Sequence, residues 1–73
     1  MKVMAESTSK IVQVNGVPAR IWEGTTEAGV PCHLFVTRVA VVEGADQTQF
    51  EAELQECKPP SPEVAAIDAR LVL

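Results

Sequence analysis

The pair Asn15-Gly16, which separates two runs rich in β-branched residues, constrains the fold of this chain more than any other feature. A type I′ turn needs positive φ at both central residues; asparagine tolerates this conformation and glycine adopts it freely. Asn-Gly in this setting is the strongest short-range signal for a β-hairpin. A two-residue loop also fixes the register, so that Val14 lies opposite Val17, and Val12 opposite Ala19.

Alternation along the two predicted strands divides their side chains between two faces. The apolar face, which predicts a core, carries Val12, Val14, Val17, Ala19 and Ile21. The other face is mixed, and it carries Ile11, Gln13, Pro18, Arg20 and Trp22. Pro18 has no N–H, so its nitrogen must point away from a neighbouring strand or lie at a bulge.

A second turn is expected between Gly24 and Pro31, where two glycines occur. The tightest loop has Ala28-Gly29 at its tip and sets Trp22 opposite Phe35. The third strand is then expected to run from Cys32 to Val42. A slip of one residue would move every side chain of this strand to the other face.

The expected third strand is apolar on both of its faces, which is typical of a strand buried on both sides. One helix can cover only one face of a small sheet, so we expect a second copy of the chain to cover the other. Arg38 is a charge among mostly apolar positions. It requires a carboxylate, solvent or a subunit boundary.

A helix is expected from Asp46 to Cys57, with Asp46 as its N-cap and Gln49 completing a capping box. Its narrow apolar stripe consists of Phe50, Leu54 and Cys57, and its acidic residues outside the stripe are Glu51, Glu53 and Glu56. Lys58 to Pro62 contains three prolines that end the helix.

The C-terminal part begins with Ser61-Pro62, which predicts a short helical turn through Ala66. Residues 67–73 alternate between apolar and polar, which predicts a short strand parallel to the third. A helix over residues 63–73 is the alternative, because alanine and leucine favour helices. Whether the strand lies beside the third strand or the first is left open.

The predicted fold class is therefore α+β. A three-stranded antiparallel β-meander is followed by one amphipathic helix and a short C-terminal strand. Residues 1–9 are expected to form a flexible N-terminal tail, and residues 10–73 a single small domain.

The charge distribution argues against several classes of partner. The net charge is −4, and the six basic residues are spread singly along the chain. Nucleic acids and anionic membranes both require clustered basic residues, so neither is expected as a partner. The sequence has no apolar run long enough to span a membrane and no visible secretory signal, which predicts a cytoplasmic protein.

Cys32 and Cys57 are expected to be reduced and partly buried, with a disulfide between them as the alternative. Cys32 and His33 are neighbours on a strand and point to opposite faces, so they cannot easily share a metal or form a nucleophile–base pair. We expect no metal, no cofactor and no enzymatic activity.

The candidate interaction residues are Arg20, Trp22, His33, Phe35, Arg38, Glu51, Glu53 and Glu56. The expected register places Arg20, Trp22, His33 and Phe35 on one sheet face. The leading hypothesis is a non-catalytic interaction and assembly module that forms a homodimer through an apolar sheet face. One alternative is an acidic adaptor or inhibitor that binds a basic protein through the helix 46–57. The other is a small-ligand site in a dimer cleft near His33 and Trp22.

Overall fold

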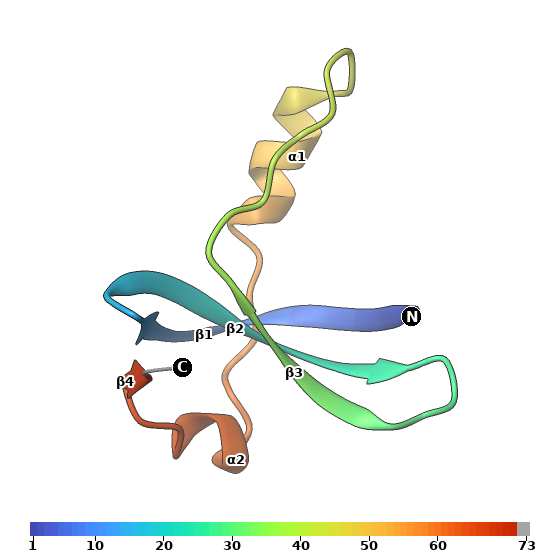
Figure 1. The fold of residues 1–73 in the computed structure, drawn as a ribbon. Helices are drawn as coiled ribbons and strands as arrows, with labels where there is room; N and C mark the ends of the chain where they lie inside the picture. The colour runs from blue at the N-terminus through green and yellow to red at the C-terminus, as the bar shows by residue number, and fades with distance from the viewer. Residues whose placement is uncertain (72–73) are drawn as a thin grey trace.

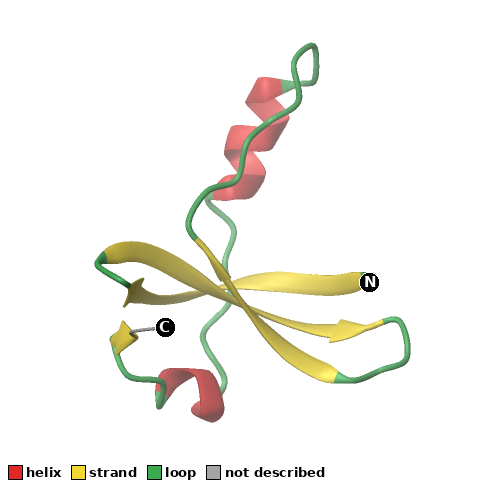
Figure 2. Cartoon of the chain, in the orientation of Figure 1, coloured by secondary structure: helices red, strands yellow, loops and turns green. Residues whose placement is uncertain are grey.

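The fold is α+β, in a computed structural model that describes residues 1–71. Figure 1 shows a twisted sheet with a helix on either side, and Figure 2 distinguishes its strands from its helices. The elements are β1 (Val3–Val14), β2 (Val17–Thr26), β3 (Pro31–Val36), α1 (Gln47–Leu54), α2 (Pro62–Ala65) and β4 (Arg70–Leu71). The sheet order is β3-β2-β1-β4, and β1, β2 and β3 form the expected antiparallel meander.

The first hairpin has the predicted turn. Asn15 and Gly16 adopt φ values of 51° and 82°, as a type I′ loop requires. Val14 pairs with Val17, and Val12 with Ala19. This part of the fold follows directly from the two residues at the turn.

The N-terminus differs from the expected flexible tail, because β1 begins at Val3 and pairs with β2 from that residue onward. The register shifts between Ser7 and Ile11. Thr8, inside this irregularity, is fully buried, and its hydroxyl donates to the Ile21 carbonyl oxygen at 2.7 Å. This hydrogen bond gives the buried Thr8 hydroxyl a partner at the point where the regular pairing of β1 with β2 is interrupted.

The predicted register of the second hairpin is wrong by one residue. Trp22 lies opposite Leu34, and Phe35 lies opposite Ile21. Gly29 has a φ of 87° and its N–H donates to the Thr26 carbonyl at 2.9 Å, while the Thr26 N–H donates to the Val30 carbonyl at 2.9 Å. These bonds close a loop of three residues instead of two, and a loop of odd length exchanges the faces of the following strand.

The third strand ends at Val36 instead of the expected Val42. In the observed register Val36 pairs with Arg20, so the next bonded position would set Arg38 opposite Pro18. Pro18 has no N–H to donate to the Arg38 carbonyl. The ladder therefore stops where the proline nitrogen faces the third strand.

Helix α1 begins as predicted and ends early. Asp46 is its N-cap, and its Oδ1 accepts a hydrogen bond from the Gln49 N–H at 3.0 Å. The helix stops at Leu54, so Cys57 lies outside it, and none of its residues is buried. The expected amphipathic helix is thus not confirmed; α1 projects away from the sheet (Figure 1).

Helix α2 provides the cover that α1 does not. Its N-cap is Ser61 and its C-cap is Ala66, as the sequence predicts. Val64 is fully buried against Val12 and Ile21 and completes the hydrophobic core. We call this side of the sheet the covered face, and the side that carries Ile11 and Trp22 the open face.

The linker between the helices is fixed to the outer edge of β1. The Lys58 N–H donates to the Ser7 carbonyl, and the Lys58 carbonyl accepts from the Ser9 N–H, both at 3.0 Å. These bonds direct the following residues onto the covered face, opposite to α1.

The expected C-terminal strand over residues 67–73 is not confirmed. Two residues, Arg70 and Leu71, pair in parallel with Gln13 and Val14 of β1, and residues 72 and 73 lie outside the described part of the chain. The Gln13 N–H also donates to the Ala69 carbonyl at 2.8 Å. Arg70 and Leu71 therefore lie beside β1 and not beside β3.

Candidate interaction surface

The open face of the sheet, α1 and the residues that follow β3 enclose a hollow of about 550 Å³, which we call the open-face groove. It is lined by Ser7, Ile11, Pro18, Arg20, Trp22, Val36, Thr37, Arg38, Val39, Phe50, Glu53, Leu54 and Gln55. Apolar side chains from three separate segments thus meet around one concavity. A small number of charged groups lie among them.

The floor of the groove comes from β1 and β2. Ile11, Pro18, Arg20 and Trp22 occupy alternate positions of these strands and share one face. Trp22 is half-buried. The Arg20 guanidinium donates from Nη1 to the Thr8 carbonyl at 2.8 Å, which holds this side chain across the irregular part of β1.

The wall formed by α1 carries Phe50 and Leu54, one turn apart on the helix. Phe50 is half-buried and Leu54 is exposed. Glu53 and Gln55 supply polar groups beside them. The helix therefore borders the open face and does not seal it.

The groove brings together some of the sequence-predicted residues and excludes others. Arg20, Trp22, Arg38 and Glu53 line it, while Glu51 and Glu56 are exposed and do not. His33 and Phe35 lie on the covered-face side, because the register sets them opposite Glu23 and Ile21. The expected single face of Arg20, Trp22, His33 and Phe35 is therefore wrong, for the same reason as the register.

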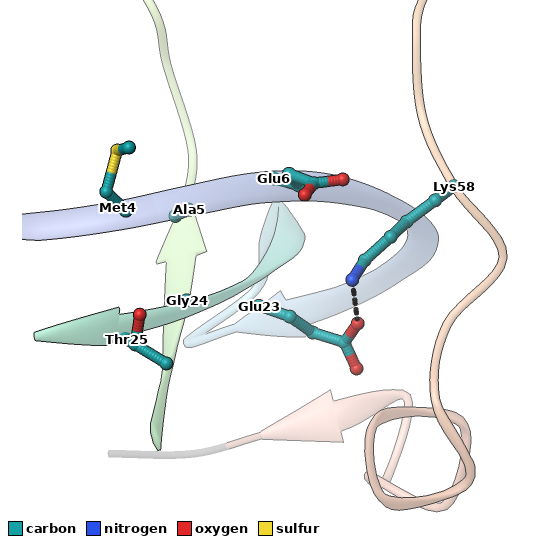
Figure 3. Close-up of a pocket in the computed structure, with 7 residues that line it drawn as sticks. All are labelled: Met4, Ala5, Glu6, Glu23, Gly24, Thr25 and Lys58. Carbon is teal, nitrogen blue, oxygen red and sulfur yellow. Dashed lines mark ion pairs between the residues drawn. The ribbon is translucent and has the colours of Figure 1, made fainter. Parts of the chain in front are cut away.

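A second hollow, of about 400 Å³, lies beside the linker on the covered side of the sheet. Figure 3 shows Lys58 reaching from the linker to Glu23, with Glu6 alongside. Lys58 Nζ is 2.9 Å from Glu23 Oε2, and Glu23 Oε1 accepts a hydrogen bond from the Ser61 N–H at 3.1 Å. One carboxylate thus holds both ends of the linker that leads into α2.

The electrostatics of this pair follow from its contacts. The hydrogen bonds from Ser61 and Lys58 lower the pKa of Glu23 from 4.5 to about 2. The hydrogen bond to Glu23 also raises the pKa of Lys58 above its ordinary value. Each group favours the charged form of the other, so the pair acts as a clamp between β2 and the linker.

Sequence reasoning did not identify this clamp. Glu23 directly precedes the second expected turn and Lys58 directly follows the expected helix, so no local pattern connects them. Because the two residues are far apart in the sequence, alternation and spacing within one segment cannot predict that they are in contact.

The two cysteines do not form a disulfide with each other. Cys32 is half-buried and Cys57 is exposed, and both are free thiols. Within residues 1–71, no group of three or more histidine, cysteine, aspartate or glutamate side chains could hold a metal ion. No helix in that same part of the chain is long and apolar enough to cross a membrane.

Comparisons with protein-family models, curated proteins and solved structures find no match to this chain.

Proposed function

We propose that this protein is a non-catalytic interaction and assembly module that associates with a second copy of itself through the open-face groove. The observation that carries the proposal is the missing cover of the open face. Helix α1 contributes no buried residue, and Ile11 and Leu54, which line the groove, remain exposed. Apolar surface of this kind favours burial against another protein.

The total solvent-accessible surface of the chain also supports self-association. The chain exposes 5661 Å², about 1,300 Å² more than a compact monomer of its mass would expose. A standard protein interface buries about 800 Å² on each partner. The radius of gyration, 13.2 Å, likewise exceeds the ~11 Å of a compact chain of this length. The excess surface is sufficient for a stable dimer.

The test is light scattering coupled to size exclusion, at two protein concentrations and two salt concentrations. We expect a mass of twice 7.8 kDa that does not change with salt, because burial of apolar surface is not screened by ions. A mass of 7.8 kDa at high micromolar concentration would contradict the proposal.

A matched pair of variants locates the interface. Ile11 lines the groove and is 51% exposed, while Val30 lies in the β2–β3 loop and is 57% exposed. We expect Ile11→Asp to yield monomers and Val30→Asp to remain dimeric, because only the first places a charge in the interface. Equal behaviour of the two variants would exclude the groove as the contact surface.

A second candidate function uses the acidic residues after Asp46. Glu51, Glu53 and Glu56 are exposed, and none forms an ion pair within residues 1–71. Such a surface suits a basic protein partner whose binding weakens with salt. Charge reversal of all three residues should abolish binding to a basic protein column; unchanged retention would exclude this role.

A further inference from the structure

The two edges of the sheet differ in how the chain covers them. The outer side of β1 bonds to the Lys58 backbone and to β4. The opposite edge is β3, and among residues 1–71 no backbone hydrogen bond reaches its outer side. Charged side chains commonly protect such an edge, but β3, with the sequence PCHLFV, contains no aspartate, glutamate, lysine or arginine. β3 therefore presents an unprotected backbone edge to another strand.

The backbone groups on this edge follow from the β2–β3 ladder. The Thr26 N–H donates to the Val30 carbonyl at 2.9 Å, and bonded pairs recur at every second residue along β3. The residues between the bonded pairs are Pro31, His33 and Phe35. Their backbone groups point away from β2, and Pro31 offers a carbonyl but no N–H.

We propose that β3 pairs antiparallel with β3 of a second copy, about a two-fold axis that passes through Leu34 perpendicular to the sheet. This inference rests on the proposed self-association and specifies the backbone contact that joins the two copies. His33 then lies opposite Phe35 of the other copy, and Leu34 lies opposite Leu34. Opposite residues are an even number of positions apart, so every side chain stays on its own face of the joined sheet.

The proline at the start of β3 selects this register. With the axis at Leu34, the N–H and C=O groups of His33 bond to those of Phe35 in the other copy, so all outward groups of these two residues gain a partner. An axis at His33 would set Pro31 opposite Phe35 and leave the Phe35 carbonyl without a donor. An axis at Phe35 would set His33 opposite Thr37, which lies beyond the end of β3.

The pairing is continuous with the open-face groove. Leu34 lies opposite Trp22 on the open face, and Val36 lines the groove. The joined sheet therefore carries both open faces on the same side, next to each other. Each copy uses its unprotected edge in the contact, and the outer side of β1 is already bonded, so the assembly closes at two copies.

The test exploits the two-fold axis, because only a residue on the axis lies opposite itself. Leu34→Lys and Leu34→Glu each place like charges on Cα atoms about 4.5 Å apart. We expect each variant to raise the dissociation constant of the dimer about tenfold. An equimolar mixture of the two restores opposite charges and should dimerise about fivefold more tightly than either variant alone. Sedimentation equilibrium gives the constants, and circular dichroism verifies the fold.

Val36 supplies the matched control on the same face of β3. In the proposed register it lies opposite Cys32 of the other copy, so the two Val36 residues are about 13 Å apart along the strands. Mixing Val36→Lys with Val36→Glu should therefore give no recovery. Recovery on mixing His33→Lys with His33→Glu, and not with the Leu34 variants, would move the axis to His33 and overturn the register.

Hydrogen exchange of the wild type tests the backbone bonds directly. We expect amide protection at His33 and Phe35 to rise with protein concentration, because their N–H groups bond only across the contact. The amides of Leu34 and Val36 already bond to β2 and should change little. Unchanged exchange at His33 and Phe35 in the dimer would exclude the pairing, even if the Leu34 variants failed to fold.

The outcomes separate the two proposals. A wild-type monomer overturns the self-association and this contact with it. A wild-type dimer that neither Leu34 variant weakens, or whose Leu34 variants do not recover on mixing, overturns the pairing through Leu34 alone and leaves the open-face groove as the contact.

Discussion

The covered face and the open face are built from alternate residues of the same two strands, yet the chain packs them very differently. On the covered face, Val12 and Ile21 are fully buried beneath Val64 of α2. On the open face, Ile11 remains exposed and Trp22 half-buried. The two helices differ correspondingly: four-residue α2 contributes a buried side chain, and eight-residue α1 contributes none.

The comparison indicates that the way a helix is attached to the sheet, and not its length, decides whether it contributes to the core. The backbone bonds of Lys58 to Ser7 and Ser9 fix the linker at the edge of β1. The Glu23 clamp then holds Ser61, the N-cap of α2, on the covered side. Helix α1 precedes this point of attachment and remains on the other side of the sheet.

The two faces should differ most in how much an isoleucine contributes to the free energy of unfolding. Ile21→Ala should lower the free energy of unfolding by about 2–5 kcal/mol, because it leaves a cavity beneath Val64. Ile11→Ala should lower it by less than about 0.5 kcal/mol under conditions where the chain is monomeric. Urea unfolding followed by Trp22 fluorescence measures both.

If Ile21→Ala is already unfolded without urea, Ile21→Val gives the graded measurement, with an expected loss of about 0.5–1.5 kcal/mol. Equal losses for the two alanine variants would contradict the difference between the faces.

Gly24 tests the close contact between β1 and β2. A Cβ at this position would lie 2.5 Å from the Met4 carbonyl oxygen and 2.9 Å from the Ala5 Cβ. Gly24→Ala should therefore cost about 1–3 kcal/mol, since backbone atoms must move to admit the methyl group. The neighbouring exposed substitution Thr25→Ala is the control, and thermal unfolding is the measurement. A neutral Gly24→Ala would show that the strands separate readily here.

The Glu23 clamp makes stability depend on pH. Because the pKa of Glu23 falls from 4.5 to about 2 on folding, its stabilising effect is complete above pH 4.5 and is lost as the pH falls towards 2. The unfolding midpoint of the wild type should exceed that of Glu23→Gln at pH 7, and the gap should close near pH 2. A gap that stays constant over this range would mean that the charge of Glu23 does not hold the linker.

The pKa of Lys58 is raised on folding, so its contribution to stability changes with pH in the direction opposite to that of Glu23. Its contribution is present below the ordinary lysine pKa and is lost at pH values above the raised one. Lys58→Met should remove any loss of stability that the wild type shows in this alkaline range, as thermal unfolding over the same pH series would reveal.

The smallest expected effects distinguish the two helix caps. Ser61→Ala should lower the free energy of unfolding by about 1 kcal/mol, because α2 belongs to the cooperative core. Asp46→Ala removes a similar cap from α1 and should reduce helical circular dichroism without moving the unfolding midpoint. Equal shifts of the midpoint would show that α1 folds together with the core.

The candidate surface was predictable only in part. Arg20 and Trp22 share a face by simple alternation, and the structure confirms this. His33 and Phe35 were assigned to that face through a loop one residue too short. The hydrogen bonds around Thr26 and Gly29 favour the longer loop, and composition does not distinguish the two lengths.

The sequence alone determined the first hairpin, its apolar face and the caps of both helices. These features depend on residues adjacent along the chain: Asn-Gly permits positive φ at two positions, and Asp46 and Ser61 accept N–H bonds from three residues ahead. The tertiary structure decided where β3 ends, which helix covers the core and which face remains open. Those outcomes depend on the contact of Pro18 with the third strand and on the contact of Lys58 with β1. Because each contact joins segments that are far apart in the sequence, no periodic pattern of residues predicts it.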